Sequence, residues 1–227
     1  MIIGSGLIAG RFSQFKHDNL LLFASGVSNS RSNNKNEYNR ELELLEKHNV
    51  ANPAKTLIYF STYSVVDPSQ KDTYYVKHKL AVEEYIKNRK GDYLIVRTSN
   101  IVGKTSNPNT ITNFLFNHIN NQQEFECWQN AERNLLDVDH LVNMCMRLVA
   151  HNLINRTVFL VNPISYPVPK IVAQFEKITG KTALCTYVDK GAVFDFDKSV
   201  SERLFKDHSV ETSNYLEMVI QKYYGKD

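Results

Sequence analysis

The chain opens with Ile2-Ile-Gly-Ser-Gly-Leu-Ile-Ala-Gly10, a short apolar stretch followed by the pattern G-x-G-x-x-A. In this pattern Gly4 permits a tight turn, Gly6 lets a pyrophosphate approach the backbone, and Ala9 allows a helix to pack closely on a strand. A helix over residues 7–15 would direct its free N-terminal amides at the phosphates. The stretch therefore predicts a strand–turn–helix unit that binds a dinucleotide. An ordinary glycine-rich turn has the same pattern, so other segments must decide between the two.

A second pattern carries chemistry of its own. Tyr75 and Lys79 lie within Thr73-Tyr-Tyr-Val-Lys-His-Lys79, and a spacing of four residues places both side chains on one face of a helix. A nearby ammonium favours the phenolate form, so the tyrosine can exchange a proton readily. Thr62 stands thirteen residues before Tyr75, at the end of an apolar run. This set suits proton transfer to or from a carbonyl or alcohol oxygen. Because Y-x-x-x-K also occurs by chance, the interpretation depends on context.

The rest of the chain alternates between strand-like and helix-like patterns. This alternation predicts an α/β fold, in which a parallel sheet is covered by helices on both faces. Ligands in such sheets bind beyond the carboxyl ends of the strands, where Gly4, Ser25, Thr62 and Asn100 would gather. The predicted strands cover residues 19–25, 57–62, 94–103 with its turn, 124–129 and 157–162, and the predicted helices cover residues 37–48, 77–89, 111–120, 168–179 and 214–224.

Together these segments resemble the extended branch of the short-chain dehydrogenase/reductase family, which acts on nucleotide sugars. Residues 19–28 resemble that branch's fourth strand, residues 57–62 the strand that ends in the Ser/Thr of the catalytic triad, and residues 94–103 the next strand with its R-x-x-N-x-x-G turn. Residues 38–45 are similar to the helix that carries an inward Asn, here Asn39, and residues 133–141 to the R-D-F-x-x-V-D-D segment. The resemblance implies a Rossmann-like sheet with a small C-terminal substrate lobe.

The resemblance also implies roles at the matched positions. Tyr75 corresponds to the acid/base, Lys79 to the residue that favours its phenolate and holds the nicotinamide ribose, and Thr62 to the hydroxyl that bonds the reacting oxygen. Asn100 matches the substrate-contacting Asn, and Arg133 can pair with a diphosphate bidentately. The alternative for Asn100 is a turn residue, and the alternative for Arg133 is a charge exposed to solvent. The residues expected to bind the cofactor NAD or NADP are Gly4, Gly6, Leu7, Ile8, Ala24, Ser25, Thr98 and Ser99, together with Tyr75 and Lys79.

Two further side chains are candidates on weaker grounds. Asn109 precedes the predicted helix 111–120 and can reach a sugar or phosphate of the substrate, although helix capping by Asn109 or Thr110 explains this segment more simply. Trp128, the single tryptophan, can stack on a base or sugar. Buried packing is the more common role of a large aromatic side chain.

The first departure from the family pattern concerns the reaction. Dehydratases of this branch need an Asp-Glu pair directly after the Thr, and this chain has Tyr63 and Ser64 there. Neither side chain can serve as a carboxylate acid or base, so elimination of water is not expected. Reduction of a keto group, oxidation of an alcohol and epimerisation through a transient ketone remain.

The second departure concerns the cofactor. The dinucleotide fold expects an acidic residue about twenty positions beyond the glycines, to hold the adenosine ribose. Residues 19–25 follow the first helix closely, and the small pair Ala24-Ser25 fits the family's fourth strand. We interpret this as loss of the family's second and third strands, which makes the first strand the edge of the sheet. Few residues then remain to contact the adenosine half of the cofactor. The alternative is that residues 19–25 are the second strand, with Ser28, Ser30 and Arg31 contacting a 2′-phosphate of NADP.

Length and composition fit a globular enzyme. The chain has 227 residues and 42% hydrophobic content, enough for a substantial core. We expect residues 1–162 to form the cofactor-binding core, with 104–130 contributing to the substrate lobe, and residues 163–227 to form that lobe. Three cysteines without C-x-x-C spacing and seven histidines without ligand spacing predict neither a disulfide framework nor a metal site. A net charge of +3 does not indicate nucleic-acid binding. Without a signal peptide or an apolar run of membrane-spanning length, we expect a cytoplasmic protein that does not contact the membrane.

The expected function is NAD(P)H-dependent reduction of a keto group on a nucleotide-linked sugar, of the kind that supplies polysaccharide biosynthesis, with Tyr75 as the proton donor. Nucleotide-sugar epimerisation is the alternative within enzymes. An alternative of another class is a non-catalytic member that binds a nucleotide sugar or a partner chain. The resemblance also allows a homodimer, although no residue here demands one.

Overall fold

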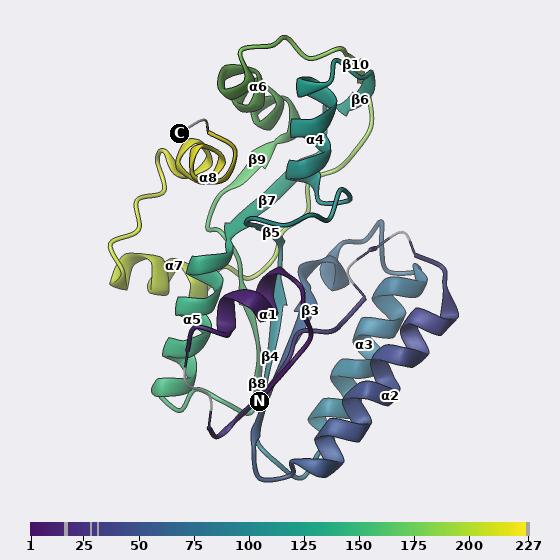
Figure 1. Cartoon of the computed structure of the whole chain (residues 1–227), viewed down its shortest axis with the longest axis vertical. Helices are drawn as coiled ribbons and strands as arrows, with labels where there is room; N and C mark the ends of the chain where they lie inside the picture. Colours follow the sequence, from purple (N-terminus) through teal and green to yellow (C-terminus); the bar gives the residue numbers. More distant parts are fainter. Residues whose placement is uncertain (16–17, 28, 31, 226–227) are drawn as a thin grey trace.

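A computed structural model describes residues 1–15, 18–27, 29–30 and 32–225 of the chain. Its centre is a sheet of five parallel strands in the order β1-β2-β3-β4-β8 (Figure 1). These strands are β1 (Ile2–Ile3), β2 (Leu20–Phe23), β3 (Thr56–Thr62), β4 (Tyr93–Thr98) and β8 (Arg156–Leu160). The predicted α/β class with a parallel, Rossmann-like sheet is confirmed.

The position of β1 decides between the two readings of residues 19–25. β1 lies at the edge of the sheet and, among the described residues, pairs only with β2, with Ile2 opposite Leu22 and Ile3 opposite Phe23. β2 in turn pairs with β3, as the family's fourth strand does with its fifth. A second strand would instead lie on the far side of β1. The interpretation that two strands are lost is therefore confirmed, and the alternative is wrong.

Helices cover both faces of this sheet because its strands are apolar on both sides. On one face α2 (Lys35–Ala51) and α3 (Tyr74–Lys87) pack on Leu21, Leu57 and Tyr59. On the other face α1 (Leu7–Phe12) and α5 (Val138–Ala150) lie over the alternate residues of the same strands, Leu22, Ile58 and Phe60 among them (Figure 1). The strong alternation fixes the register of each strand, since a slip of one residue would exchange the two faces.

Short strands and helices that follow β4 and lie outside the central sheet form a lobe at one end of the molecule (Figure 1). One small sheet has the order β5-β7-β9, and a parallel pair is formed by β10 and β6. The strands are β5 (Asn100–Val102), β6 (Phe125–Trp128), β7 (Glu132–Asp137), β9 (Ser165–Pro167) and β10 (Cys185–Val188). The helices are α4 (Ile111–Asn120), α6 (Val168–Thr179) and α8 (Tyr215–Tyr224).

The helix α7 (Ser199–Asp207) returns from the lobe to the sheet. Its Ser201 is fully buried against β8, the strand at the second edge. The Ser201 hydroxyl donates to the carbonyl of Phe159 at 3.1 Å and accepts from the amide of Val161 at 3.0 Å. One side chain thus satisfies two backbone groups along the outer edge of this strand.

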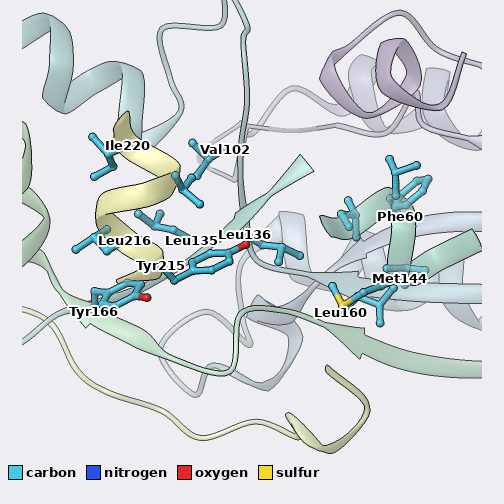
Figure 2. Close-up of a cluster of buried hydrophobic side chains, with 14 of the residues drawn as sticks. Phe60, Val102, Leu135, Leu136, Met144, Leu160, Tyr166, Tyr215, Leu216 and Ile220 are labelled. Carbon is cyan, nitrogen blue, oxygen red and sulfur yellow. The ribbon is translucent and has the colours of Figure 1, made fainter. Parts of the chain in front are cut away.

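A continuous apolar core joins the sheet to the lobe. Figure 2 shows part of it, with Phe60 and Leu160 from the central sheet, Leu135 and Leu136 from β7, and Tyr215 from α8. Tyr215 is fully buried, and its hydroxyl accepts from the Asp137 amide at 3.1 Å. Since one cluster contains side chains of both parts, the lobe is packed onto the sheet.

Most predicted helices appear near their predicted bounds. The helices at 111–120 and 168–179 match, and the latter ends at Gly180 with a left-handed φ of 69°. The first helix ends at Phe12, three residues short of the prediction, while α2 is longer than the predicted 37–48. Among the described residues no helix has both the length and the apolar character needed to cross a bilayer.

Candidate active site at the carboxyl ends of the strands

The glycine-rich turn between β1 and α1 has the geometry that its sequence predicts. Gly4 has a φ of 128°, and a Cβ there would lie 2.4 Å from the carbonyl oxygen of Ala24. Gly4 thus lies directly against the end of β2, beside Ser25. A Cβ on Gly6 would meet no atom within 4 Å, so the backbone at the start of α1 is open to an approaching group. Ala9 is 3% exposed and packed inward.

The helix α3 carries Tyr75 and Lys79 on its buried face. Thr73 caps this helix, its hydroxyl accepting from the amide of Val76 at 3.3 Å. Tyr75 is 9% exposed and Lys79 only 2%. The Lys79 Nζ lies 5.8 Å from the centroid of the Tyr75 ring, so the predicted pair is brought together.

Thr62 ends β3, opposite Thr98 of β4, and is 7% exposed. It caps the short 3₁₀ helix η1 (Tyr63–Val66), because its Oγ1 accepts from the amide of Ser64 at 3.1 Å. A hydroxyl that accepts a hydrogen bond still has its own proton to donate. Thr62 is therefore held in place by the backbone while its O–H can point to a ligand oxygen.

The closest polar partners of Lys79 are residues that sequence reasoning did not assign to the site. Its Nζ donates to Glu41 Oε1 at 2.9 Å and to the Tyr59 hydroxyl at 3.0 Å. Gly26 lies against the same atom, since a Cβ there would be 2.6 Å from Nζ. The ribose contact that the resemblance assigns to Lys79 would use the third N–H of the ammonium.

Glu41 is fully buried and gathers several donors. Its Oε1 also accepts from the Tyr59 hydroxyl at 2.7 Å, and its Oε2 from the Val27 amide at 2.7 Å, while His78 Nε2 lies 3.1 Å from Oε2. Burial acts to raise the pKa of Glu41, but the Lys79 ammonium, His78 and the Val27 and Tyr59 hydrogen bonds together hold that pKa well below its ordinary range. Glu41 is therefore a carboxylate in the folded protein.

The expectation of an inward Asn39 is wrong, because Asn39 is exposed and Glu41 occupies the inner face of α2. The buried stripe of this helix runs through Tyr38, Glu41 and Leu45. Their spacing of three and four residues follows the helical period, so the position of Glu41 was detectable. Sequence reasoning missed it because a charged residue is placed on the solvated face by default.

The segment after β4 lies beside Thr62 and Tyr63. The Thr98 hydroxyl donates to the carbonyl of Leu160 at 2.8 Å, which ties β4 to β8. The Ser99 Oγ is buried and has no hydrogen-bond partner within the described part of the chain. The Asn100 Nδ2 donates to the Asn134 carbonyl at 3.1 Å and to the Tyr63 hydroxyl at 3.3 Å. Because a buried hydroxyl without a partner is costly, Ser99 is a natural contact for a ligand.

Tyr63 lies where the family's dehydratases have a carboxylate. Its ring packs on Phe194 and Phe196 from the segment before α7, with centroid distances of 5.3 and 5.4 Å. Burial raises the pKa of Tyr63, while the nearby Arg133 guanidinium and the bond from Asn100 act to lower it. The net shift is upward, so this phenol is neutral at ordinary pH. Arg133 itself is half-buried on β7 and donates to the Glu132 carbonyl at 2.8 Å.

The other candidates lie as follows. Leu7 contacts the Gly103 backbone, and Ile8 packs partly against the core. Asn109 lies in the exposed turn before α4, where Thr110 is the helix cap, as the simpler explanation predicts. The Trp128 Nε1 donates to Glu126 Oε2 at 3.3 Å. Ser28 and Arg31, from the alternative reading of the cofactor site, lie outside the described residues.

Two cavities stand out in the described part of the chain. The larger, about 540 Å³, lies between the loop after β5, α4 and α8. The smaller, about 170 Å³, lies between α5 and α7. Neither of the two is lined by Thr62, Tyr75 or Lys79. No group of three or more His, Cys, Asp or Glu side chains suited to a metal ion occurs among the residues described.

Comparison with known proteins identifies the family and the fold. The model of the NAD dependent epimerase/dehydratase family matches residues 9–161, which begin just after the glycine turn. Comparison with curated proteins finds no match.

Solved structures of similar fold include RMD from Pseudomonas aeruginosa complexed with NADPH, with a TM-score of 0.73, 12% identity, and coverage of 97% of this chain and 96% of that one. UDP-N-acetylglucosamine 4-epimerase from Methanobrevibacter ruminantium M1, in complex with UDP-N-acetylmuramic acid, has a TM-score of 0.69, 14% identity, and coverage of 89% and 76%. UDP-glucuronic acid 4-epimerase from Bacillus cereus, in complex with NAD, has a TM-score of 0.69, 18% identity, and coverage of 92% and 75%. At these identities the likeness concerns the fold.

Proposed function

Because the chain belongs to the NAD dependent epimerase/dehydratase family, we propose that it reduces a keto group on a nucleotide-linked sugar with NADH or NADPH. The observation that carries the proposal is the set formed by Thr62, Tyr75 and Lys79. A threonine held by its backbone cap, a buried phenol and a buried ammonium 5.8 Å from that ring supply the groups that carbonyl reduction needs. Tyr63 and Ser64 follow Thr62, so the carboxylates of a dehydratase are missing at the matched positions.

The residues present fit the pyrophosphate and the nicotinamide half of a dinucleotide. The open backbone at Gly6 leaves room for a pyrophosphate, and the buried Ser99 hydroxyl lacks a protein partner in the described part of the chain. We assign the phosphates to the turn at Gly4, Gly6, Leu7 and Ile8, and the nicotinamide half to the surroundings of Ala24, Ser25, Thr98 and Ser99. Solved structures of the same fold hold NADPH or NAD. The bound cofactor supplies the hydride.

The side chains of this chain then manage the oxygen and its proton. The Thr62 O–H donates to the carbonyl oxygen and polarises it, while Tyr75 gives its phenolic proton to the same oxygen as the alcohol forms. Lys79 stabilises the phenolate that remains until solvent returns the proton. Asn100 and Arg133, at the lobe side of the same site, are proposed to bind the sugar and the diphosphate.

The decisive experiment compares Tyr75→Phe with Tyr74→Phe. Purified protein is mixed with NADPH or NADH and a panel of nucleoside diphosphate keto-sugars, and cofactor oxidation is followed together with the product. Tyr75→Phe removes the proton donor and should lower kcat by a factor of about 10² to 10⁴ while leaving cofactor affinity within about threefold. Tyr74 carries the same phenol but is 52% exposed, so its variant should retain turnover. Full activity in Tyr75→Phe would rule out this donor.

Epimerisation is the second candidate, favoured by the epimerases among the solved structures of this fold. An epimerase oxidises and re-reduces the same sugar, so it must keep its cofactor bound through both steps. The β1 edge offers the adenosine half little support, and this favours a reductase that exchanges cofactor. The assays separate the two, because a reductase consumes one NAD(P)H per product and an epimerase consumes none.

A non-catalytic binding role is the remaining possibility. It predicts that a nucleotide sugar binds while neither NADH nor NADPH binds at millimolar concentration. A cofactor titration by fluorescence measures this directly. The joint presence of Thr62, Tyr75 and Lys79 in one buried arrangement argues for turnover.

A further inference from the structure

A buried charge network surrounds Lys79, and its acidic member is Glu41. Glu41 is 0% exposed, its Oε1 lies 2.9 Å from the Lys79 Nζ, and the Tyr59 hydroxyl bonds to both groups. Burying two charges costs free energy unless their geometry and hydrogen bonds compensate. Here the compensation is extensive, since the same carboxylate also accepts from the Val27 amide at 2.7 Å. Such a network fixes the ammonium in one place.

The network also connects the parts of the proposed site. Glu41 comes from α2, Lys79 from α3 and Tyr59 from β3, while Val27 follows the end of β2 where Ala24 and Ser25 lie. Gly26 allows this close approach, because a Cβ there would lie 3.0 Å from Glu41 Oε1. Glu41 therefore ties the proposed catalytic lysine to the backbone of the proposed cofactor turn.

We propose that Glu41 is a positioning residue for the reduction, one that holds the Lys79 ammonium beside the Tyr75 ring and sets a negative charge next to this pair. This inference rests on the proposed function. A negative charge beside an ammonium stabilises the cation, and the same charge opposes formation of a phenolate nearby. The charge of Glu41 therefore acts against proton loss from this pair, and reduction consumes the phenolic proton.

Other ionisable groups face the same pair and are part of the argument. His78 of α3 lies 3.1 Å from Glu41 Oε2, and Tyr38 of α2 packs on His78 with a centroid distance of 4.7 Å. Burial and the neighbouring Glu41 raise the pKa of Tyr59 well above its ordinary value, so Tyr59 remains a donor. Glu83, one turn beyond Lys79, is a second buried carboxylate, but it pairs with Arg97 at 2.7 Å.

The test is the pH dependence of Glu41→Gln, a change that keeps the shape and removes the charge. Without the carboxylate, both the ammonium and the phenol lose a proton more readily, and either loss stops reduction. The alkaline limb of the kcat profile should therefore move to lower pH by about one unit, the size expected for one nearby charge. Glu41→Asp retains the charge and should keep the limb close to its wild-type position. An unmoved limb in Glu41→Gln would overturn the proposal.

Glu83→Gln is the matched control. It removes a carboxylate that is also 0% exposed and that lies on α3, the helix of Lys79. This carboxylate accepts hydrogen bonds from Ser61 at 2.6 Å and from Arg97. Glu83→Gln should lower the free energy of unfolding about as much as Glu41→Gln does. It should leave the alkaline limb of the kcat profile at its wild-type pH. An equal displacement of the limb in both variants would mean that any lost buried charge has this effect, and the specific role of Glu41 would be refuted.

A second readout does not need turnover. In protein labelled with ¹³C-lysine and ¹³C-tyrosine, NMR follows the titration of Lys79 and Tyr75, assigned through Lys79→Arg and Tyr75→Phe. Both midpoints should fall by about one pH unit in Glu41→Gln and stay in Glu41→Asp. If wild-type protein turns over no keto-sugar but these midpoints move, the proposed function fails and the charge coupling stands. If turnover occurs and the midpoints do not move, only the inference about Glu41 fails.

Discussion

At the scale of single residues, three glycines in one short stretch are not constrained alike. Gly4 combines a positive φ of 128° with a backbone oxygen 2.4 Å from where a Cβ would lie, so no other residue fits there. Gly6 and Gly10 have no atom within 4 Å of that position. The protein alone therefore explains Gly4 but not Gly6. A bound pyrophosphate would explain Gly6.

This difference leads to a prediction for Gly6→Ala and Gly10→Ala. Gly6→Ala should leave the free energy of unfolding nearly unchanged but weaken NADPH binding by about tenfold or more, because the new methyl group occupies the space of the phosphates. Gly10 lies inside α1, so Gly10→Ala should raise the free energy of unfolding by about 0.5–1 kcal/mol and leave binding alone. Urea unfolding and cofactor titration measure both. Equal NADPH affinity in the two variants would contradict a phosphate site at Gly6.

A buried thiol provides a pH prediction. Cys145 is fully buried, and burial raises its pKa to about 12, whereas a thiol in the unfolded chain ionises near 8.5. Between these values the unfolded state binds fewer protons than the folded state, so the free energy of unfolding should fall as pH rises, by up to about 1.4 kcal/mol per unit. Urea midpoints from pH 8 to pH 11 measure the slope. Cys145→Ala should reduce that slope, and an unchanged slope would exclude Cys145 as a source.

The catalytic candidates could be predicted from sequence because each is tied to a short pattern. The spacing of Tyr75 and Lys79 alone places both on one helix face, and Thr62 follows from the end of an apolar strand. Glu41 and Tyr59 belong to no such pattern. The helical period of Tyr38 and Leu45 indicates that Glu41 faces inward. Its partners cannot be read from that period, because they come from three elements that meet only in space.

At the scale of elements, α8 is attached to the start of α5 by a buried acid. Asp137 caps α5 through the Asp139 amide and is 1% exposed. The Lys222 Nζ donates to its Oδ2 at 2.7 Å and the Tyr223 hydroxyl to its Oδ1 at 2.7 Å. Burial acts to lower the pKa of Lys222, but its bonds to Asp137 and Asp139 raise that pKa overall. The terminal helix is thus held by charge as well as by its apolar face.

We predict that Lys222→Met lowers the free energy of unfolding by about 1–3 kcal/mol, because it leaves a buried carboxylate without its cation. The control is Lys177→Met, which removes an ion pair between α6 and the same α8. There the side chains of Lys177 and Glu217 are 65% and 52% exposed, so the loss should stay below about 1 kcal/mol. Urea unfolding compares them. Equal losses would show that burial of Asp137 does not matter.

Element bounds were predictable where a cap or an apolar period marks them. Thr110 and Gly180 delimit α4 and α6 at the residues expected from their chemistry. The bounds of α2 were missed at both ends, since Asn34 caps it before the predicted start at residue 37 and the helix runs on past residue 48 to Ala51. The start of α2 is polar and has no apolar residue to mark it, while Val50 near its end is exposed and does not continue the buried stripe.

At the scale of the whole molecule, the sheet has lost the side that normally supports the adenosine half of a dinucleotide. β1 is the edge strand of the described sheet, and only β2 pairs with it. This arrangement was predictable from the order of segments and from Ala24-Ser25. The packing of α7 back onto β8 was not, because it depends on contacts between residues about forty positions apart in sequence, Phe159 and Val161 with Ser201.

The lost side leads to a prediction about cofactor fragments. Reduced nicotinamide mononucleotide lacks the adenosine half, and we expect its Kd to be less than about tenfold weaker than that of NADPH, a difference below about 1.4 kcal/mol. Fluorescence titration of both compounds measures the ratio. A reductase with a complete dinucleotide fold is the control, and it should show a much larger ratio. If this protein binds NADPH a hundredfold more tightly than reduced nicotinamide mononucleotide, some other part of the chain binds the adenosine half.

Removing strands from a sheet exposes new backbone amides and carbonyls, which can recruit strands from neighbouring molecules and start aggregation. Both borders of this sheet are poor templates. β1 has two residues, too few to register a foreign strand, and the Ser201 hydroxyl already occupies a carbonyl and an amide along β8. In this shortened sheet one border is thus very short, and the other is partly occupied by a side chain of its own chain.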